Sequence, residues 1–153
     1  MADSKRELVL QHLEELLAKI LTGNDYQTNM GTSVRRGIRG SIEEADAPAL
    51  VIKEGVETIS TLNLEKNDCY LPVELTGYVA FSDSDINNWS VLGNMMLADI
   101  IKCIGSDTTI NSTAIDTEPG DRFIDEPEPD SSVLRVEANF TIHYRTGYLD
   151  PYN

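Results

Sequence analysis

The sequence predicts an α+β fold: a single domain in which a mainly antiparallel sheet carries two amphipathic helices packed on one face. Two segments have apolar residues at helical spacing, several others alternate as strands do, and the helices and strands are grouped rather than interleaved one by one. A chain of 153 residues, 41 % of them hydrophobic, is long enough to bury one core. With no internal repeat, we expect one domain over residues 1–153.

The first predicted helix covers residues 4–21. Ser4 and Glu7 form a capping box, which is typical of a helix start, and Gly23 follows the last apolar residue, where helices commonly end. The spacing therefore predicts a helix with one buried stripe. This stripe consists of Leu10, Leu13, Leu17 and Ile20.

Three arginines stand close together in the polar, glycine-rich stretch at residues 22–47. Arg35 and Arg36 lie in a short predicted strand at residues 33–36, and Arg39 follows just before a group of acids. One interpretation is contact with phosphate or with an acidic neighbour. The other is an internal salt bridge or a solvated strand edge. The sequence leaves both open.

Three strands are predicted in the middle of the chain, at residues 49–54, 56–64 and 69–82. The first is a short apolar run, which is typical of a central strand. The third alternates, and Pro72 within it removes a backbone donor, which predicts an edge position or a bulge there. The residues on its expected buried side are Cys69, Leu71, Val73, Leu75, Val79 and Phe81.

A second amphipathic helix is predicted over residues 84–104, with Asp83 or Ser84 as its N-cap and Gly105 as its end. Its methionine and aromatic residues at helical spacing indicate core filling rather than a cofactor pocket. The stripe consists of Trp89, Leu92, Met96, Ile100 and Ile104.

After this helix we expect a weak strand at residues 108–116 and then a flexible acidic loop at about 117–132. A loop of this length in a compact domain is usually functional or disordered. Phe123 and Ile124 form an apolar pair within it, and we expect this pair to need a partner's surface to cover it.

The chain closes with the cleanest strand pattern in the sequence, at residues 132–146. Apolar and polar side chains alternate along it without a break. A C-terminal tail at about 147–153 follows, in which Tyr148, Leu149 and Tyr152 are expected to act as aromatic and apolar anchors.

The charge of the chain limits its partners. With 26 acidic and 12 basic residues, the formal net charge of −14 opposes stable binding to nucleic acid. No run of 18 or more apolar residues suggests a membrane span, and no signal peptide precedes the first helix, so we expect synthesis in the cytosol and no membrane partner. Cys69 and Cys103 are expected to be small buried residues with no redox role.

The sequence contains no recognisable catalytic, cofactor-binding or metal-binding motif. It lacks the phosphate-binding glycine loops, the nucleophile elbow, the zinc helix motif and a C-x-x-C pair, and His12 and His143 lie in elements of different type. Residues 83–87 begin like a calcium loop, but Asn88 replaces the required glycine and Asn94 the required glutamate. We therefore expect a protein that is not an enzyme and that needs no cofactor or metal.

The order of elements resembles the tail terminator, or tail-completion, proteins of long-tailed bacteriophages. The residues that carry the resemblance lie in short stretches: a V-x-R-like strand at residues 34–36, a P-x-L-x-I strand at 48–52 leading into Gly55 and Glu57, and a closing I-x-Y-R-T strand followed by Asp150-Pro151. The acidic segment at 117–132 is a departure from the pattern. The closing matches are Ile142, Tyr144, Arg145, Thr146, Asp150 and Pro151.

The resemblance implies a structural virion protein, made in the host cytoplasm, that forms a hexameric ring at the head-proximal end of the tail tube. Such a ring ends tube growth and provides the head-to-tail joining surface, so its partners are the tail-tube protein and head–tail connector proteins. The genome passes through it, and a negative lumen lets DNA slide without stable binding.

The contacts between copies in such a ring are a hypothesis drawn from this chain alone. The candidate subunit-interface residues are Arg35, Arg36, Arg39, Phe123, Ile124, Tyr148, Leu149 and Tyr152. Two alternatives stay open: another neck or tail-tube protein, or an acidic DNA mimic that inhibits a DNA-binding protein.

Overall fold

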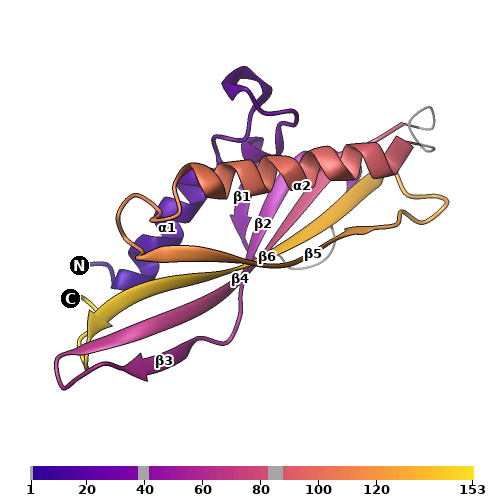
Figure 1. The fold of residues 1–153 in the computed structure, drawn as a ribbon. Coiled ribbons are helices and arrows are strands. Elements are labelled where there is room, and N and C mark those ends of the chain that lie inside the picture. The colour runs from indigo at the N-terminus through magenta and orange to yellow at the C-terminus, as the bar shows by residue number, and fades with distance from the viewer. Residues whose placement is uncertain (1, 38–41, 83–87) are drawn as a thin grey trace.

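The computed structural model describes residues 2–37, 42–82 and 88–153. These residues form a single domain that is roughly α+β, with one mixed, mostly antiparallel sheet of six strands and two α-helices (Figure 1). The strands follow the order β1-β2-β4-β6-β5, and β3 pairs with β4 off this path.

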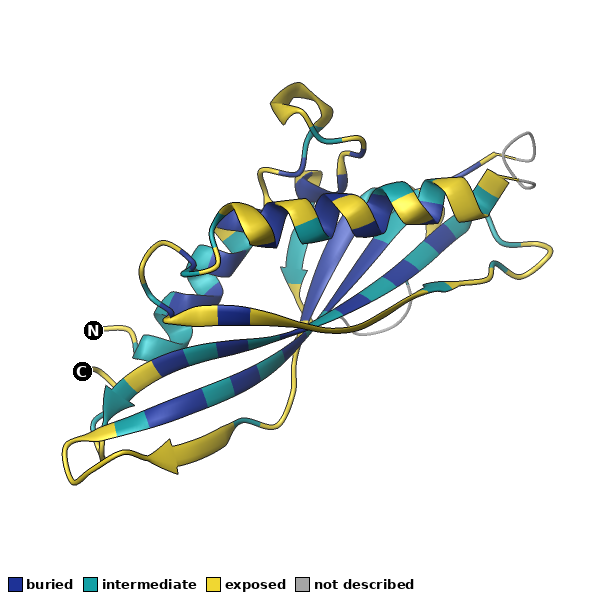
Figure 2. Ribbon diagram, in the orientation of Figure 1, coloured by how far each residue is buried: buried dark blue, intermediate teal, exposed yellow. Residues whose placement is uncertain are grey.

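Two long strands form the centre of the sheet. β4 (Lys66–Ala80) and β6 (Val133–Gly147) pair antiparallel along their whole length, from Lys66 opposite Gly147 to Ala80 opposite Val133. Because alternate residues of a strand point to opposite faces, β6 buries every second side chain (Figure 2). β4 also buries Asp68 and Thr76 on its other face, and Val79, expected on the buried side, is only partly buried. The predicted alternation of β6 is confirmed, with the buried side formed by Leu134, Val136, Ala138, Phe140, Ile142 and Tyr144.

The second edge of β4 is shared by two shorter strands. β2 (Ala49–Glu54) pairs with its later half and β3 (Thr58–Thr61) with its beginning, both antiparallel. Pro72 lies where one partner gives way to the other, and its carbonyl accepts a hydrogen bond from Gly55 N at 2.8 Å. The missing donor of Pro72 therefore falls in the gap between two partner strands, which explains a proline inside a central strand.

β1 (Val34–Arg36) pairs with β2 in parallel and makes the sheet mixed. It confirms the short strand predicted at this place. The strand predicted over residues 56–64 is shorter than expected, because only the four residues of β3 join the sheet.

The first helix, α1 (Lys5–Leu17), begins as predicted but ends early. Ser4 caps it, with its Oγ accepting a hydrogen bond from Glu7 N at 3.2 Å. Beyond Leu17 the backbone tightens, since the N–H groups of Lys19 and Ile20 bond to carbonyls three residues back. The expected end at Gly23 was wrong, although Ile20 is still buried in the core.

The second helix, α2 (Trp89–Ser106), passes through Gly105 instead of ending there. The predicted caps Asp83 and Ser84, like the calcium-loop-like start of that segment, lie outside the described residues. The core-filling interpretation of its apolar stripe agrees with the burial of Met96, Ile100 and Ile104.

A buried carboxylate on α2 fixes the connection after α1. Asp99 is 2 % exposed and accepts hydrogen bonds from the backbone N–H groups of Gln27 and Thr28, at 3.1 and 2.8 Å, and from the Thr28 hydroxyl at 2.7 Å. Lys102, one turn further along, donates to the carbonyl of Asp25. This connection contains two short 3₁₀ helices, η1 (Thr22–Asn24) and η2 (Met30–Thr32), and the bonds to Asp99 and Lys102 hold it against α2.

The weak strand predicted at residues 108–116 was wrong. Residues 108–113 form turns, in which Ile110, Asn111 and Ser112 all have positive φ. The Asp107 carboxylate accepts hydrogen bonds from the N–H groups of Thr109 and Asn111, and such local bonds favour a turn over a strand.

The flexible loop predicted at 117–132 was also wrong over its first half. Residues Asp116–Asp125 form β5, which pairs antiparallel with β6, and only the residues after Asp125 form a loop. The register shifts between Pro119 and Arg122. Pro119 and Gly120 interrupt the alternation of side chains at this irregularity, and the sequence pattern therefore does not predict a strand here.

One hydrophobic core holds these elements together. Buried residues of α1 and α2 belong to the same cluster as the inward residues of β4 and β6 (Figure 2). Cys69 and Cys103 are buried free thiols within it, as predicted. In the described part of the chain, no helix combines the length and apolar character that crossing a membrane requires.

Candidate functional site

One apolar surface lies around β3, the start of β4 and the end of β6, which are neighbours in the sheet (Figure 1). Several large apolar side chains are exposed there, including Val56 at 85 %, Leu64 at 87 % and Leu149 at 88 %. We call this the hairpin-end surface. It comprises Val56, Ile59, Leu62 and Leu64 from the β3 region and Tyr148, Leu149 and Tyr152 from the C-terminal tail.

The tail is held against the body by backbone hydrogen bonds. Tyr148 N donates to Glu65 O at 2.9 Å, and Lys5 N, in the first turn of α1, donates to Pro151 O at 2.8 Å. The second bond satisfies a donor that a helix start leaves free. The tail therefore folds back between α1 and the β3–β4 turn and has a defined place, with Leu149 pointing to solvent.

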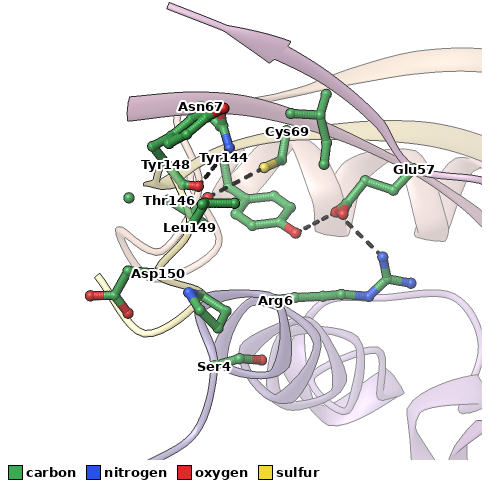
Figure 3. Close-up of a pocket in the computed structure, with 13 residues that line it drawn as sticks. Ser4, Arg6, Glu57, Asn67, Cys69, Tyr144, Thr146, Tyr148, Leu149 and Asp150 are labelled. Atoms are coloured by element: carbon green, nitrogen blue, oxygen red, sulfur yellow. Dashed lines mark hydrogen bonds and ion pairs between the residues drawn. The ribbon is translucent and has the colours of Figure 1, made fainter. Parts of the chain in front are cut away.

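A cavity of about 400 Å³ lies beneath the tail (Figure 3). Its floor includes a row across three strands, because Ile59 pairs with Cys69 and Cys69 pairs with Tyr144. Cys69 and Tyr144 are covered, whereas Ile59 is 59 % exposed. The apolar face of the sheet thus continues past the part that the rest of the domain covers.

A polar network borders the cavity on the side of α1. The Tyr144 hydroxyl donates a hydrogen bond to the Glu57 carboxylate, and Arg6 pairs with Glu57 at 3.3 Å (Figure 3). Arg6 also pairs with Glu54 at 2.8 Å. Burial, then the bond to Glu57, raises the pKa of Tyr144, so its hydroxyl stays protonated and remains a donor. These contacts tie the start of β3 to α1 and β6.

The thiol that lines the cavity is unreactive in this environment. Burial raises the pKa of the Cys69 thiol, which keeps it protonated and poorly nucleophilic. Among the described residues, no group of three or more His, Cys, Asp or Glu side chains is arranged to hold a metal ion. The site offers an apolar floor with Tyr148 and Leu149 on the side of the tail and charged groups on the side of α1, and its apolar part suits contact with another apolar surface.

The arginines singled out by the sequence are largely occupied within the chain. Arg36 binds both carboxylate oxygens of Glu7, at 2.7 and 3.0 Å, and its Nε lies 3.3 Å from Glu14. Arg35 lies 3.6 Å from Asp46. Arg39 lies outside the described residues. For Arg36 the internal salt bridge, one of the two interpretations left open, is the arrangement found.

Phe123 and Ile124, the apolar pair of the acidic segment, differ in burial. Ile124 is partly buried and packs against α2, where a Cβ added to Gly93 would lie 2.7 Å from its Cγ2. The expectation that both residues need a partner's surface is therefore wrong for Ile124. Phe123 stays 45 % exposed, with the Arg135 guanidinium 5.8 Å from its ring centre.

A charged cluster lies on the opposite face of the same strands. Asp68 accepts a hydrogen bond from Arg145 Nε at 2.7 Å and lies 3.0 Å from Nε2 of His143, whose ring stacks on Tyr70. These contacts lower the pKa of Asp68, Arg145 being the first cause and His143 the second. The structure thus places His143 beside the Asp68–Arg145 ion pair, on the polar face predicted for it.

The sequence prediction named the tail but missed the β3 half of the hairpin-end surface. Residues 56–64 were interpreted as a strand, whose apolar side chains would normally be half-buried. A signal was present, since Val56, Ile59, Leu62 and Leu64 do not follow the alternation that would bury them on one face of a sheet.

Comparison with known proteins adds no family. No protein-family model matches the chain, and no curated protein matches it significantly.

Proposed function

We propose that this protein is a structural virion subunit that forms a hexameric ring at the head-proximal end of a phage tail tube. In this role it ends tube growth, offers the surface to which the head joins, and contacts the tail-tube and head–tail connector proteins. It acts by assembly, without catalysis or a cofactor. The closing strand with Tyr144, Arg145 and Asp150-Pro151, which resembles tail terminator proteins, supports this assignment.

The observation that carries the proposal is the hairpin-end surface. Large exposed apolar patches on a small protein are typical of surfaces that bind another protein. Here three of the exposed residues, Ile59, Tyr148 and Leu149, border a cavity with an apolar floor, and the backbone of both the hairpin and the tail is fixed by hydrogen bonds. A preformed apolar surface loses little entropy when a partner covers it.

The proposal assigns the main contact to apolar residues and a smaller part to the arginines. The pairs of Arg36 with Glu7 and Glu14 would have to break before this guanidinium reached a neighbouring copy. Tyr148, Leu149 and Tyr152, in contrast, are exposed in the isolated chain. The proposal also includes both helices on one face of the sheet, supported by the single core cluster that they share with β4 and β6.

The net charge fits passage of DNA through a ring. Six copies would carry six times the −14 of one chain, and acids that face the lumen would repel the phosphates of a passing genome. Repulsion keeps DNA mobile, whereas a basic lumen would retain it.

The test is the assembly state of the purified protein, alone at high concentration and with isolated tail tubes, by mass photometry and negative-stain microscopy. The unchanged protein should form six-membered rings. Ile59→Glu and Leu149→Glu should abolish them, because each places a charge on the apolar surface. Val91→Glu is the matched control, since Val91 is 60 % exposed on α2, away from the hairpin-end surface.

A chain that stays monomeric in both conditions would remove the proposed function. Rings that survive both Ile59→Glu and Leu149→Glu would show that the hairpin-end surface is not the contact between copies. Thermal unfolding of each variant checks that it is folded, and exposed positions should change stability little.

A further inference from the structure

The sheet has three strands with only one partner each. Among the described residues, β1 pairs only with β2, β3 only with β4, and β5 only with β6. Each strand therefore presents a free edge of backbone N–H and C=O groups, to which another strand could add.

Two of these edges carry features that hinder pairing along their length. β1 has only three residues, two of which are arginines. β5 contains Pro119, and its register shifts after this residue, so its regular part with a free edge is short. The exposed side chains of that part, Asp116 and Glu118, are acidic.

β3 has none of these protections. Its four residues, Thr58–Thr61, are all exposed, and none is charged or proline. Threonine, isoleucine and serine leave its backbone accessible, and β-branched residues favour strand pairing. A cation lies just beyond the end of β3: Lys66 is exposed and takes part in no ion pair among the described residues.

We propose that the free edge of β3 in one copy pairs with the Asp116–Glu118 part of β5 in the next copy, so that the sheet continues between subunits. The acids of β5 then approach Lys66, whose charge is opposite. This inference rests on the proposed ring and adds the strands that join its subunits.

The strand directions agree with this pairing. β3 is antiparallel to β4, β4 to β6, and β6 to β5, so β3 and β5 run in opposite directions within one copy. Two copies placed side by side in the same orientation would therefore bring the strands together antiparallel. The two edges differ, so the contact is heterologous, which is the type that closes into rings.

The side chains also point the same way. Thr58 and Ser60 share a face with Tyr70 and Asp68 of β4, and the pairing of β4 through β6 to β5 puts Asp116 and Glu118 on this face. Cysteines placed on both edges would hence meet on one side of the continuous sheet.

The test is disulfide formation between copies. Ser60→Cys with Glu118→Cys, and Thr58→Cys with Glu118→Cys to allow for the register, should give a ladder of covalent oligomers on a non-reducing gel. Two strands lie between β3 and β5 within one copy, so a bond inside a single chain is too long. The natural Cys69 and Cys103 are buried and should not react.

Ser60→Cys with Glu15→Cys is the control, because Glu15 is exposed on α1 and should give no ladder. A second test reverses charges: Glu118→Lys or Lys66→Glu alone should weaken association severalfold, and the double variant should recover most of it.

The outcomes separate the two proposals. A ladder from either edge pair, absent in the control, supports the sheet contact. Rings under the microscope with no ladder from either pair overturn this inference and leave the proposed function standing. A protein that neither forms rings nor gives a ladder refutes both.

Discussion

At the scale of single residues, the polar face of the sheet brings two carboxyl groups together. Burial is the first cause that raises the pKa of Glu137, and the second is its interaction with Glu74 on the neighbouring strand. Arg135, 4.0 Å from Glu74, compensates only in part. A raised pKa in the folded state means that the protonated form is favoured by folding.

Replacing Glu137→Gln should therefore change the pH dependence of stability. The folded pKa lies above the unfolded one, so the contribution of Glu137 to stability is complete below the unfolded pKa and is lost as pH rises through the folded pKa. Near neutral pH the variant should be more stable than the parent by about 0.2–1 kcal/mol, the range for charged pairs on neighbouring strands. At pH 4 the difference should shrink.

Urea unfolding at pH 4 and pH 7 measures this effect. Glu128→Gln, on the exposed loop after β5, is the control and should change stability little at either pH. An equal stability difference for Glu137→Gln at both pH values would contradict the proposed repulsion.

The contacts of one residue, Asp99, could not be predicted from the sequence. Asp99 stands in a segment with clear helical spacing, and nothing in that spacing indicates that its carboxylate is buried and bonded to Gln27 and Thr28. The partners are more than 70 residues away in the chain. Periodicity identifies the face of a helix that is buried, but not a polar contact made across the fold.

At the scale of elements, the contact between α2 and β5 depends on a glycine. A Cβ at Gly93 would meet three atoms of Ile124 at 3.0 Å or less, whereas one at Gly105 of the same helix would meet nothing within 4 Å. The two positions therefore separate the effect of packing from that of helix propensity.

Gly93→Ala should destabilise the protein by about 1–3 kcal/mol, because overpacking would push β5 away from α2. Gly105→Ala should be neutral or stabilise by up to about 1 kcal/mol, because alanine favours helix more than glycine does. Thermal or urea unfolding of both variants checks this. A Gly93→Ala variant as stable as Gly105→Ala would show that Ile124 moves aside without cost.

Elements with an uninterrupted pattern could be predicted, and those whose pattern is interrupted could not. β6 alternates along its whole length, so its position and its buried side were predicted correctly. β5 contains Pro119-Gly120 and many acids, which are usual in loops, and it is a strand only because β6 offers an edge to pair with. Tertiary pairing of this kind is not encoded in local sequence.

At the scale of the whole molecule, the hairpin-end surface combines a predicted and an unpredicted half. The exposed anchors of the tail follow from its position after the last strand. Ile59 is exposed because the elements that pack on the sheet do not reach β3. Their extent is a property of the whole fold and does not follow from local sequence. For the arginines, the residue was predicted but its contact was not: Arg36 was a candidate for contact with a partner, and it pairs with Glu7 of its own chain.

The net charge of −14 leads to a prediction for the complete protein. We expect no binding of double-stranded DNA, measured by fluorescence anisotropy at about 50 mM salt. At this low salt concentration any attraction between protein and phosphate would be strong. A basic DNA-binding protein serves as the positive control. Binding that weakens as salt is added would contradict the proposed repulsive lumen.

The continuous pairing of β4 with β6 also bears on mechanical strength. Fifteen residues at about 3.3 Å each give a ribbon about 50 Å long. A force that pulls Lys66 and Val133 apart along the strands would load all the ladder bonds together in shear, whereas a force across the strands would open them one after another. The subunit should thus resist tension along this ribbon far better than tension across it, and the orientation of the ribbon in a particle would decide which load it withstands.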